Sequence, residues 1–277
     1  MVGTPVAASR GNRRNAQAIS GAAELAAGPH YGRHDGPHDA VHWSSQPVVV
    51  PKPAALAGLV LVVIAGGLWV DRAGGFPGQV AVSLVVWLLV TLLCIRLPLP
   101  IGRRLIACVW ISGLGEIVAS LAWGLYDYQF GNVPLFVPPG HALLYLLGLT
   151  LVRVVDDRIA LLVPVVAAPV VVALAWTGQD MLSVPLFALF LLFIRFGRQQ
   201  RLYAIMFVLA LVLELYGTAL GNWAWRPVAP GTGLTTLNPP LAAGVFYCAL
   251  DWLINRFVSA LRPAAPTTSG DDAERRA

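Results

Sequence analysis

The sequence predicts an all-α polytopic membrane protein of about eight transmembrane helices, arranged as two parallel four-helix repeats. Three observations lead to this fold class. Of the 277 residues, 57% are hydrophobic and only 12% are charged, about half the charged share that is typical of soluble domains. The apolar residues come in long runs, and the basic residues alternate between the two sides of those runs. A series of matching residues also recurs in the same order in both halves of the chain.

The apolar runs have the length that a helix needs to cross a bilayer, roughly 18 to 20 residues. Clusters of Gly, Pro and Arg separate them. The first run begins after about fifty mostly polar residues, so we expect a signal anchor and not a cleaved signal peptide. The run at 181–196 is the shortest. The predicted helices are 54–70, 79–96, 105–124, 138–155, 159–177, 181–196, 202–221 and 239–256.

The basic residues predict the orientation of these helices. Lys and Arg in short loops are retained on the cytoplasmic side of a membrane. With eight helices, all 19 basic residues except Arg72 and Arg226 fall on one side. We therefore expect a multi-pass protein of the plasma (inner) membrane with both termini in the cytoplasm. The net charge of +5 then reflects orientation in the lipid bilayer, and no nucleic-acid partner is predicted.

The two ends of the chain are predicted to be polar tails. Residues 1–52 are rich in Gly, Ala, Pro, Arg and His and lack periodicity, which is typical of a disordered cytoplasmic tail. The first four-helix repeat is expected at 53–158 and the second at 159–258. A short cytoplasmic C-terminal tail at 259–277 follows them.

A histidine tract is the most distinctive feature of the N-terminal tail. His30, His34, His38 and His42 recur every four residues, a spacing that would align imidazoles as metal ligands on one face of a helix. The Pro and Gly residues between them disfavour that helix. No functional metal site is predicted, and adventitious metal binding by the tract is left open.

An internal duplication is indicated by residues that match in order across the two halves. Four helices separate the copies, and an even number makes them parallel, related by an axis along the membrane normal. The two matched glutamates would then face each other at the same depth. The matches are Ile95-Arg96 with Ile194-Arg195, Arg104-Leu105 with Arg201-Leu202, Glu116 with Glu214, Ser120 with Thr218, Gly124 with Gly221, Tyr126 and Tyr128 with Trp223 and Trp225, Pro138-Pro139 with Pro239-Pro240, Tyr145 with Tyr247, and Arg153 with Arg256.

Glu116 and Glu214 are the main candidates for catalytic residues. Both lie in the outer half of a predicted helix, and an intramembrane acid usually faces a cavity or a partner. One acid could donate a proton while the other accepts one. His141 is a secondary candidate for proton transfer. The alternative is that both glutamates are neutral residues that hydrogen-bond neighbouring helices together.

Aromatic and polar residues near the two acids are candidates for substrate binding. The aromatic residues fit either an interfacial belt or a pocket that steadies a developing cation. The segments 125–137 and 222–237 fit either lids over the site or ordinary loops. Asp251 could pair with Arg256. The candidate substrate-binding residues are Ser120, Trp123, Tyr126, Asp127, Tyr128, Asn132, Thr218, Asn222, Trp223, Trp225 and Asn238.

Several common catalytic motifs are missing from the sequence. It contains no phosphate-binding Gly-rich loop, no pair of membrane histidines for haem, and neither an HExxH nor a GxSxG motif. ATP-driven transport, cytochrome function and the common hydrolase mechanisms lose support as a result. No cofactor is predicted, and the sequence does not indicate an oligomeric state.

Two patches of the chain resemble the bacterioruberin-type carotenoid hydratases, which are polytopic membrane proteins of carotenoid biosynthesis. Gly115-Glu116, Gly124-Leu-Tyr-Asp-Tyr128, Gly131-Asn-Val-Pro134 and Val137-Pro138 are similar to the first half of that family. Gly221-Asn-Trp-Ala-Trp225 and Asn238 are similar to its second half. The resemblance implies an enzyme that acts on a carotenoid or another isoprenoid.

Three functions are consistent with these patterns. The leading hypothesis is a membrane enzyme that hydrates, cyclises or isomerises an isoprenoid, a carotenoid or another apolar small molecule. A proton-coupled small-molecule transporter is the second, because parallel repeats with intramembrane acids also describe such carriers. A non-catalytic membrane scaffold is the third, and it is expected if the two glutamates face different neighbours.

Overall fold

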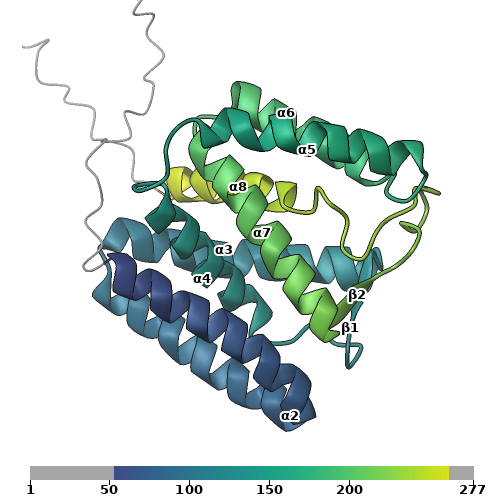
Figure 1. Ribbon diagram of the computed structural model, residues 1–277. Coiled ribbons are helices and arrows are strands. Elements are labelled where there is room, and N and C mark those ends of the chain that lie inside the picture. The colour runs from purple at the N-terminus through teal and green to yellow at the C-terminus, as the bar shows by residue number, and fades with distance from the viewer. Residues whose placement is uncertain (1–52, 262–277) are drawn as a thin grey trace, which may run out of the picture. The chain divides into compact units, whose positions relative to one another are not determined.

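A computed structural model describes residues 53–261, which belong to one compact unit. The predicted tail 1–52, its histidine tract and residues 262–277 lie outside the described residues. The described part is mostly helical (Figure 1). Its elements are α2 (Pro53–Arg96), α3 (Leu99–Glu116), the π-helix η1 (Ile117–Ala122), β1 (Tyr126–Tyr128), α4 (Val137–Leu151), α5 (Ile159–Trp176), α6 (Ser183–Phe196), α7 (Gln200–Leu220), β2 (Trp223–Trp225) and α8 (Val245–Ala260).

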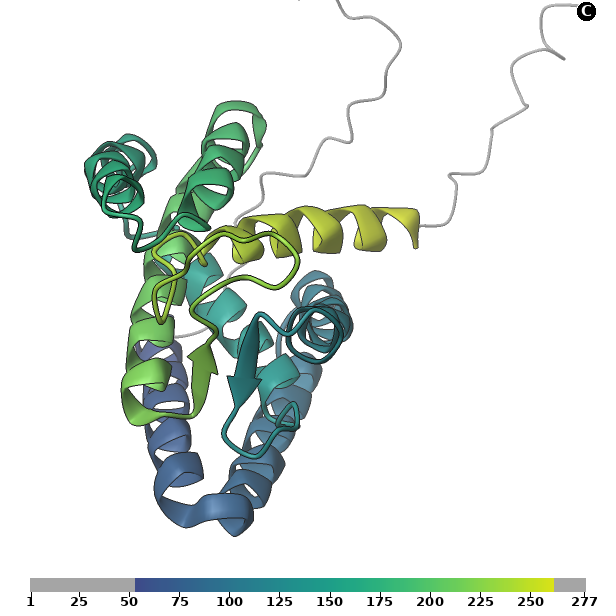
Figure 2. The same ribbon diagram turned by 90° about the vertical axis from the view of Figure 1, so that its right-hand side faces the viewer.

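Helix α2 contains the first two predicted helices, joined by a sharp kink. Gly75 has φ 59° and ψ −151°, a conformation that a residue with a side chain rarely adopts. Pro77 follows it and has no backbone N–H to donate to the helix. The two arms therefore fold back on each other, as Figure 2 shows. The predicted runs 54–70 and 79–96 each lie within one arm.

Four helical segments are long and apolar enough to cross a membrane. They are Pro53–Arg96, Leu99–Ala122, Ile159–Trp176 and Gln200–Leu220. Helices α4, α6 and α8 have 15, 14 and 16 residues, which is shorter than a bilayer crossing normally takes. Each of the eight predicted apolar runs overlaps one of the helices α2 to α8. That all eight cross the membrane stays a prediction.

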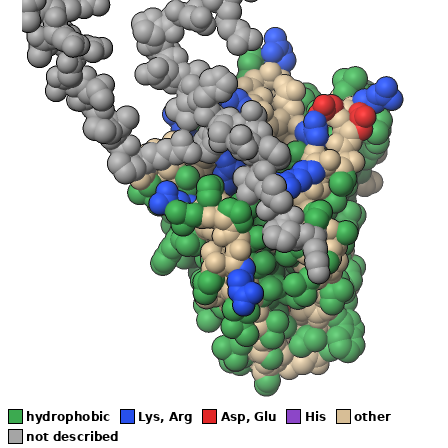
Figure 3. All heavy atoms as spheres, turned by 90° about the vertical axis from the view of Figure 1, so that its left-hand side faces the viewer, with side chains coloured by type: hydrophobic (Ala, Val, Ile, Leu, Met, Phe, Trp, Pro, Cys, Tyr) green, Lys and Arg blue, Asp and Glu red, His purple; other side chains and the backbone are tan. Residues whose placement is uncertain are grey.

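The surface of the described unit carries many large apolar side chains. Trp110 on α3 is 74% exposed and Val172 on α5 is 64% exposed. On the face shown in Figure 3, hydrophobic side chains predominate and most basic ones gather toward one end. Contiguous apolar surface of this kind indicates association with a membrane.

The start of α8 differs from the prediction that Pro239-Pro240 opens the last helix. Residues 241–244 form a turn, and α8 begins at Val245. Their amides are held from outside the segment: Leu241 N–H donates to Asp180 Oδ2 (2.8 Å) and Ala242 N–H donates to Ser183 Oγ (3.0 Å). Because side chains at the start of α6 satisfy these donors, the segment does not need helical bonds.

Close packing of α7 against the start of α8 depends on Gly244. A Cβ at this position would lie 2.6 Å from the carbonyl oxygen of Phe207 and 2.7 Å from its Cα. Backbone atoms cannot rotate away, so we expect Gly244→Val to destabilise the protein by about 1–3 kcal/mol. Thermal unfolding in detergent measures this. The matched control is Gly66→Ala, because no atom lies within 4 Å of the added Cβ there. A Gly244→Val protein as stable as that control would contradict the packing.

Candidate active site

A two-stranded antiparallel ribbon forms the centre of the candidate site. The register pairs Tyr126 with Trp225 and Tyr128 with Trp223. The two aromatic triplets that match in the sequence are thus partners across the ribbon. All four aromatic side chains are buried and lie on one face, because alternate residues of a strand point the same way. Asp127 lies exposed on the opposite face.

Glycines allow the chain to turn from each helix into the ribbon. Gly124 and Gly221 have φ of 74° and 81°, the left-handed conformation that commonly ends helices. The guanidinium group of Arg226 lies against Gly124, and that of Arg72 lies against Gly221. These are the two arginines that were predicted to lie on the outer side of the membrane. A cation at the C-terminal end of a helix is electrostatically favourable.

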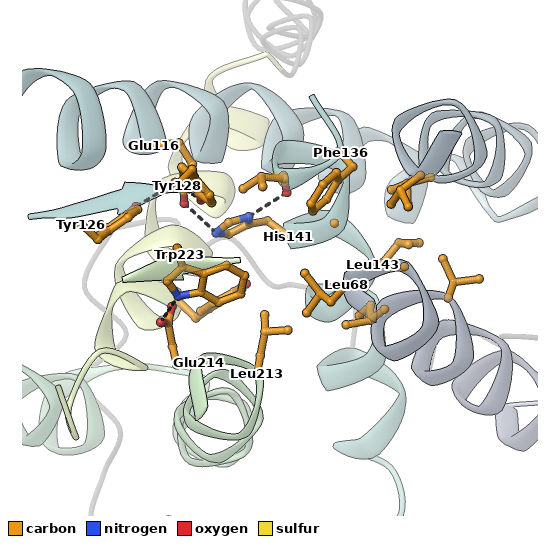
Figure 4. A pocket seen from close by; sticks show the side chains of 18 residues that line it. Leu68, Glu116, Tyr126, Tyr128, Phe136, His141, Leu143, Leu213, Glu214 and Trp223 are labelled. Carbon is orange, nitrogen blue, oxygen red and sulfur yellow. Dashed lines mark hydrogen bonds and ion pairs between the residues drawn. The ribbon is translucent and has the colours of Figure 1, made fainter. Parts of the chain in front are cut away.

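Glu116 is held by three side chains from the first half of the sequence. The hydroxyl groups of Tyr126 and Tyr128 donate to its Oε2 at 2.8 and 2.7 Å. The Nε2 of His141 lies 3.2 Å from its Oε1 (Figure 4). Burial, followed by the charge of Glu116, raises the pKa of both tyrosines well above the usual value, so both stay protonated as donors. Both oxygens of Glu116 are therefore occupied.

Glu214 is held in a matching way by the second half. The indole N–H groups of Trp223 and Trp225 both donate to its Oε2, at 2.8 and 2.9 Å. Its Oε1 receives no hydrogen bond from residues 53–261. Each acid is thus bound by the aromatic pair of its own triplet. The difference is that Glu214 keeps one oxygen free.

His141 bridges Glu116 and the backbone of α4. Its Nδ1 lies 2.9 Å from the carbonyl oxygen of Val137, and its ring stacks on Tyr247 with centroids 5.3 Å apart. Since a carbonyl can only accept, Nδ1 carries a hydrogen. The contact with Glu116 then needs one more hydrogen, either on Nε2 or on the carboxyl group. His141 and Glu116 therefore share a proton.

Two mainly apolar cavities meet at this constellation. The volumes open to the centre of a water-sized sphere are about 80 and 220 Å³. One extends between the arms of α2 and the start of α4, and the other extends between α3, α7 and α8. Five residues line both: Glu116, Tyr126, His141, Glu214 and Tyr247. The predicted glutamates and His141 are thus brought together on one shared wall.

Tyr247 is a site residue that the sequence did not single out. Its side chain is 6% exposed and lines both cavities. Its hydroxyl has no hydrogen-bond partner among the described residues. A buried unpaired hydroxyl is costly, so this group is available to an oxygen atom of a ligand. Its match with Tyr145 in the duplicated pattern was the available signal.

Three polar candidates lie outside the cavity walls and support the ribbon. The hydroxyl of Ser120 donates to the carbonyl oxygen of Tyr126 (3.1 Å), and that of Thr218 donates to the carbonyl oxygen of Glu214 (2.7 Å). The Oδ1 of Asn238 accepts the backbone N–H of Trp225 (2.9 Å). In the structure these side chains form hydrogen bonds with backbone atoms and do not line either cavity.

Four further candidates also lie away from the cavities. Trp123 donates to the carbonyl oxygen of Pro230 (2.8 Å), which ties the segment before the ribbon to the loop after it. Asp127 forms an exposed bidentate pair with Arg226, with both contacts at 3.1 Å. Asn132 and Asn222 join a buried cluster near the kink of α2.

Asp251 is paired differently from the predicted contact with Arg256. Its Oδ1 accepts the hydroxyl of Tyr145 (2.7 Å) and its Oδ2 accepts the amide of Asn255 (3.0 Å). Arg256 lies over the ring of Trp252, 5.3 Å from its centroid. Residues 251 and 256 are five apart, so they do not share a face of α8, whereas Asn255 is one turn from Asp251.

The chemical groups on the shared wall are two carboxyls, an imidazole, the phenol of Tyr126 that binds Glu116, and the free phenol of Tyr247. Across residues 53–261, no three His, Cys, Asp or Glu side chains gather in a way that could hold a metal ion. No protein-family model, no curated protein and no solved structure matches the chain. The arrangement can donate, accept and share protons beside an apolar ligand.

Proposed function

We propose that this protein is a membrane enzyme that performs acid–base chemistry on an apolar substrate, such as an isoprenoid, a carotenoid or another lipid. The observation that carries the proposal is the free Oε1 of Glu214, which lies on the wall between two apolar cavities beside a second carboxyl group. The resemblance to carotenoid hydratases in the two glutamate and ribbon segments also supports this class of substrate.

The proposed reaction begins with proton transfer from Glu214 to a carbon–carbon double bond. One carbon gains a C–H bond, the neighbouring carbon becomes a cation, and Glu214 becomes a carboxylate. The cation would lie beside the faces of Tyr126 and Trp223, where π-electrons stabilise positive charge. Water can then add and return a proton to Glu214, which gives hydration. Loss of a neighbouring C–H proton to Glu214 gives isomerisation, and attack by a second double bond before that loss gives cyclisation.

Access from lipid is supported by the second cavity. Phe246 and Leu253 line it, and both are 42% exposed on the apolar surface of α8. A hydrophobic ligand can therefore reach the shared wall without crossing water. The phenol of Tyr247 would bind an oxygen atom of the substrate, the product or the reacting water.

We further propose eight spans in two parallel repeats, in the plasma membrane with both termini cytoplasmic. Support comes from the matched surroundings of the acids: each glutamate lies before a left-handed glycine and accepts two hydrogen bonds from the following aromatic triplet. Short helices such as α6 would then cross a locally thinned bilayer.

Incubation of membranes in heavy water tests the function. Membranes with the native protein are given linear isoprenoids or carotenoids in D₂O, and products are analysed by mass spectrometry. We expect a product with one carbon-bound deuterium, because the proton on Glu214 exchanges with solvent before it is transferred. Membranes with the Glu116→Gln, Glu214→Gln double variant should give none. Native membranes that form no deuterated product, but accumulate a solute when a proton gradient is applied, would make the protein a carrier.

A further inference from the structure

A second polar cluster lies near the kink of α2 and contacts Leu68, which lines the first cavity. We name it the Asp71 cluster, and it comprises Asp71, Gln79, Gln129, Asn132 and Asn222. The Oδ2 of Asp71 accepts the amides of Asn222 (2.6 Å) and Gln129 (3.0 Å). The Oε1 of Gln79 accepts the amide of Asn132 (3.0 Å), and the Gln79 side chain faces the Asp71 carboxyl group. The cluster therefore joins both arms of α2 to the ends of the ribbon.

Four buried atoms of this cluster have no hydrogen-bond partner within residues 53–261. They are Asp71 Oδ1, Gln79 Nε2, Asn132 Oδ1 and Asn222 Oδ1. Asp71 and Asn222 are each 1% exposed and Gln79 is 3% exposed. Each unpaired buried polar group is destabilising, and native proteins rarely leave several together. Their concentration in one place points to a ligand that binds there.

We propose that the Asp71 cluster binds water, and that this water connects the outer surface with the acid site. The unpaired atoms are one donor and three acceptors. A water molecule can accept from Gln79 and donate to two oxygens, so it satisfies both kinds of group. The neighbouring guanidinium group of Arg72, which donates to Gln129 (3.2 Å), disfavours a cation.

The position of the cluster makes it a route to the acids. Gln129 directly follows Tyr128, and Asn222 directly precedes Trp223, while Tyr128 and Trp223 both line the first cavity. The amide of Asn222 also donates to the carbonyl oxygen of Leu68 (3.0 Å), another lining residue. On the other side, Gln129 is half-buried and contacts the exposed Arg72. The chain of polar groups thus runs from the surface to the cavity.

Hydrogen exchange of the Trp223 indole N–H tests the route. This proton binds Glu214 and exchanges with solvent when water reaches the cavity. Protein with ¹⁵N-labelled tryptophan is transferred to D₂O in detergent micelles, and the signal is assigned with Trp223→Phe. The test variant is Gln79→Met with Asn132→Leu, which replaces two unpaired groups by apolar ones of similar size. We expect its Trp223 N–H to exchange at least tenfold more slowly than that of the native protein.

The control for this experiment is Asn255→Leu. Asn255 also has an unpaired buried oxygen, but it lies on α8 beside Asp251. Exchange in this variant should stay within a factor of two of native. If the double variant does not fold, Gln79→Met alone is measured. Unchanged or faster exchange would overturn the route. A native thermal stability that rises in Na⁺ over choline at equal ionic strength would identify an ion in place of water.

The water route and the proposed enzyme activity can fail separately. Exchange at Trp223 needs no substrate, so slow exchange in the double variant supports the route even if no product is found. The delivery of protons and water for catalysis rests on the proposed function. If product forms in D₂O but exchange is unchanged, the enzyme stands and water reaches it elsewhere.

Discussion

Replacing Glu214 by glutamine is expected to lower product formation by roughly 10²–10⁴-fold, the usual contribution of a positioned acid or base. The amide oxygen can still accept the indole groups of Trp223 and Trp225, so packing around position 214 should persist. What is lost is the transferable proton on the free oxygen. The measurement is the rate of deuterated product per amount of folded protein in the membrane.

Two further variants test whether the loss of activity in Glu214→Gln comes from the carboxyl group of Glu214. Glu116→Gln is expected to lower the rate less, because both oxygens of Glu116 are occupied by side chains of the protein. Thr218→Val, one turn from Glu214, should stay near native, because its hydroxyl donates to backbone. A larger loss for Glu116→Gln than for Glu214→Gln would transfer the role of proton donor to Glu116. Equal loss in Thr218→Val would mean that the helix geometry, and not the carboxyl group, was disturbed.

Replacing Glu116 by leucine is expected to destabilise the protein by about 3–5 kcal/mol, the cost of breaking a buried charged pair by removing one partner. The substitution leaves the hydroxyls of Tyr126 and Tyr128 and the Nε2 of His141 without their acceptor. Equilibrium unfolding in mixed detergent micelles measures the change in the free energy of unfolding.

The control for this loss of stability is Asp127→Leu. Asp127 also belongs to the ribbon segment, but its carboxyl group is 58% exposed and its pair with Arg226 is accessible to solvent. Exposed ion pairs contribute little to stability, so this variant should unfold nearly as the native protein does. If both leucine variants are equally stable, Glu116 is not the acceptor that holds the tyrosines and His141.

The helices and the two acids could be predicted from the sequence, and the contacts between them could not. An apolar run can be recognised from the local sequence alone, and the predicted runs overlap the helices of the structure. Glu116 and Glu214 stand out because acids are rare in such runs. The start of α8 was misplaced because Asp180 and Ser183, which lie 61 and 59 residues before the amides that they bind, hold the segment that precedes it. Contacts at that separation leave no local pattern.

The ribbon illustrates the same limit. The matching triplets were visible in the sequence, but each has only three residues, too few for a recognisable strand pattern. The Asp71 cluster is similar: Asn132 and Asn222 were candidates, but the cluster joins four separate segments, and the sequence does not indicate that these segments meet. Tyr247 differs, because its proposed role depends on a hydroxyl that no residue of 53–261 binds, and only the folded chain reveals that.

The pairing register of the ribbon determines whether the two glutamates receive hydrogen bonds from the aromatic residues. Side chains on a strand alternate between faces, so a slip of one residue in either triplet would turn its aromatic donors outward. Asp127 or Ala224 would then point at a glutamate in place of two tyrosines or two tryptophans. A glutamate without its donors would face a carboxylate or a methyl group. Three residue pairs of the ribbon therefore align both aromatic triplets with their glutamates.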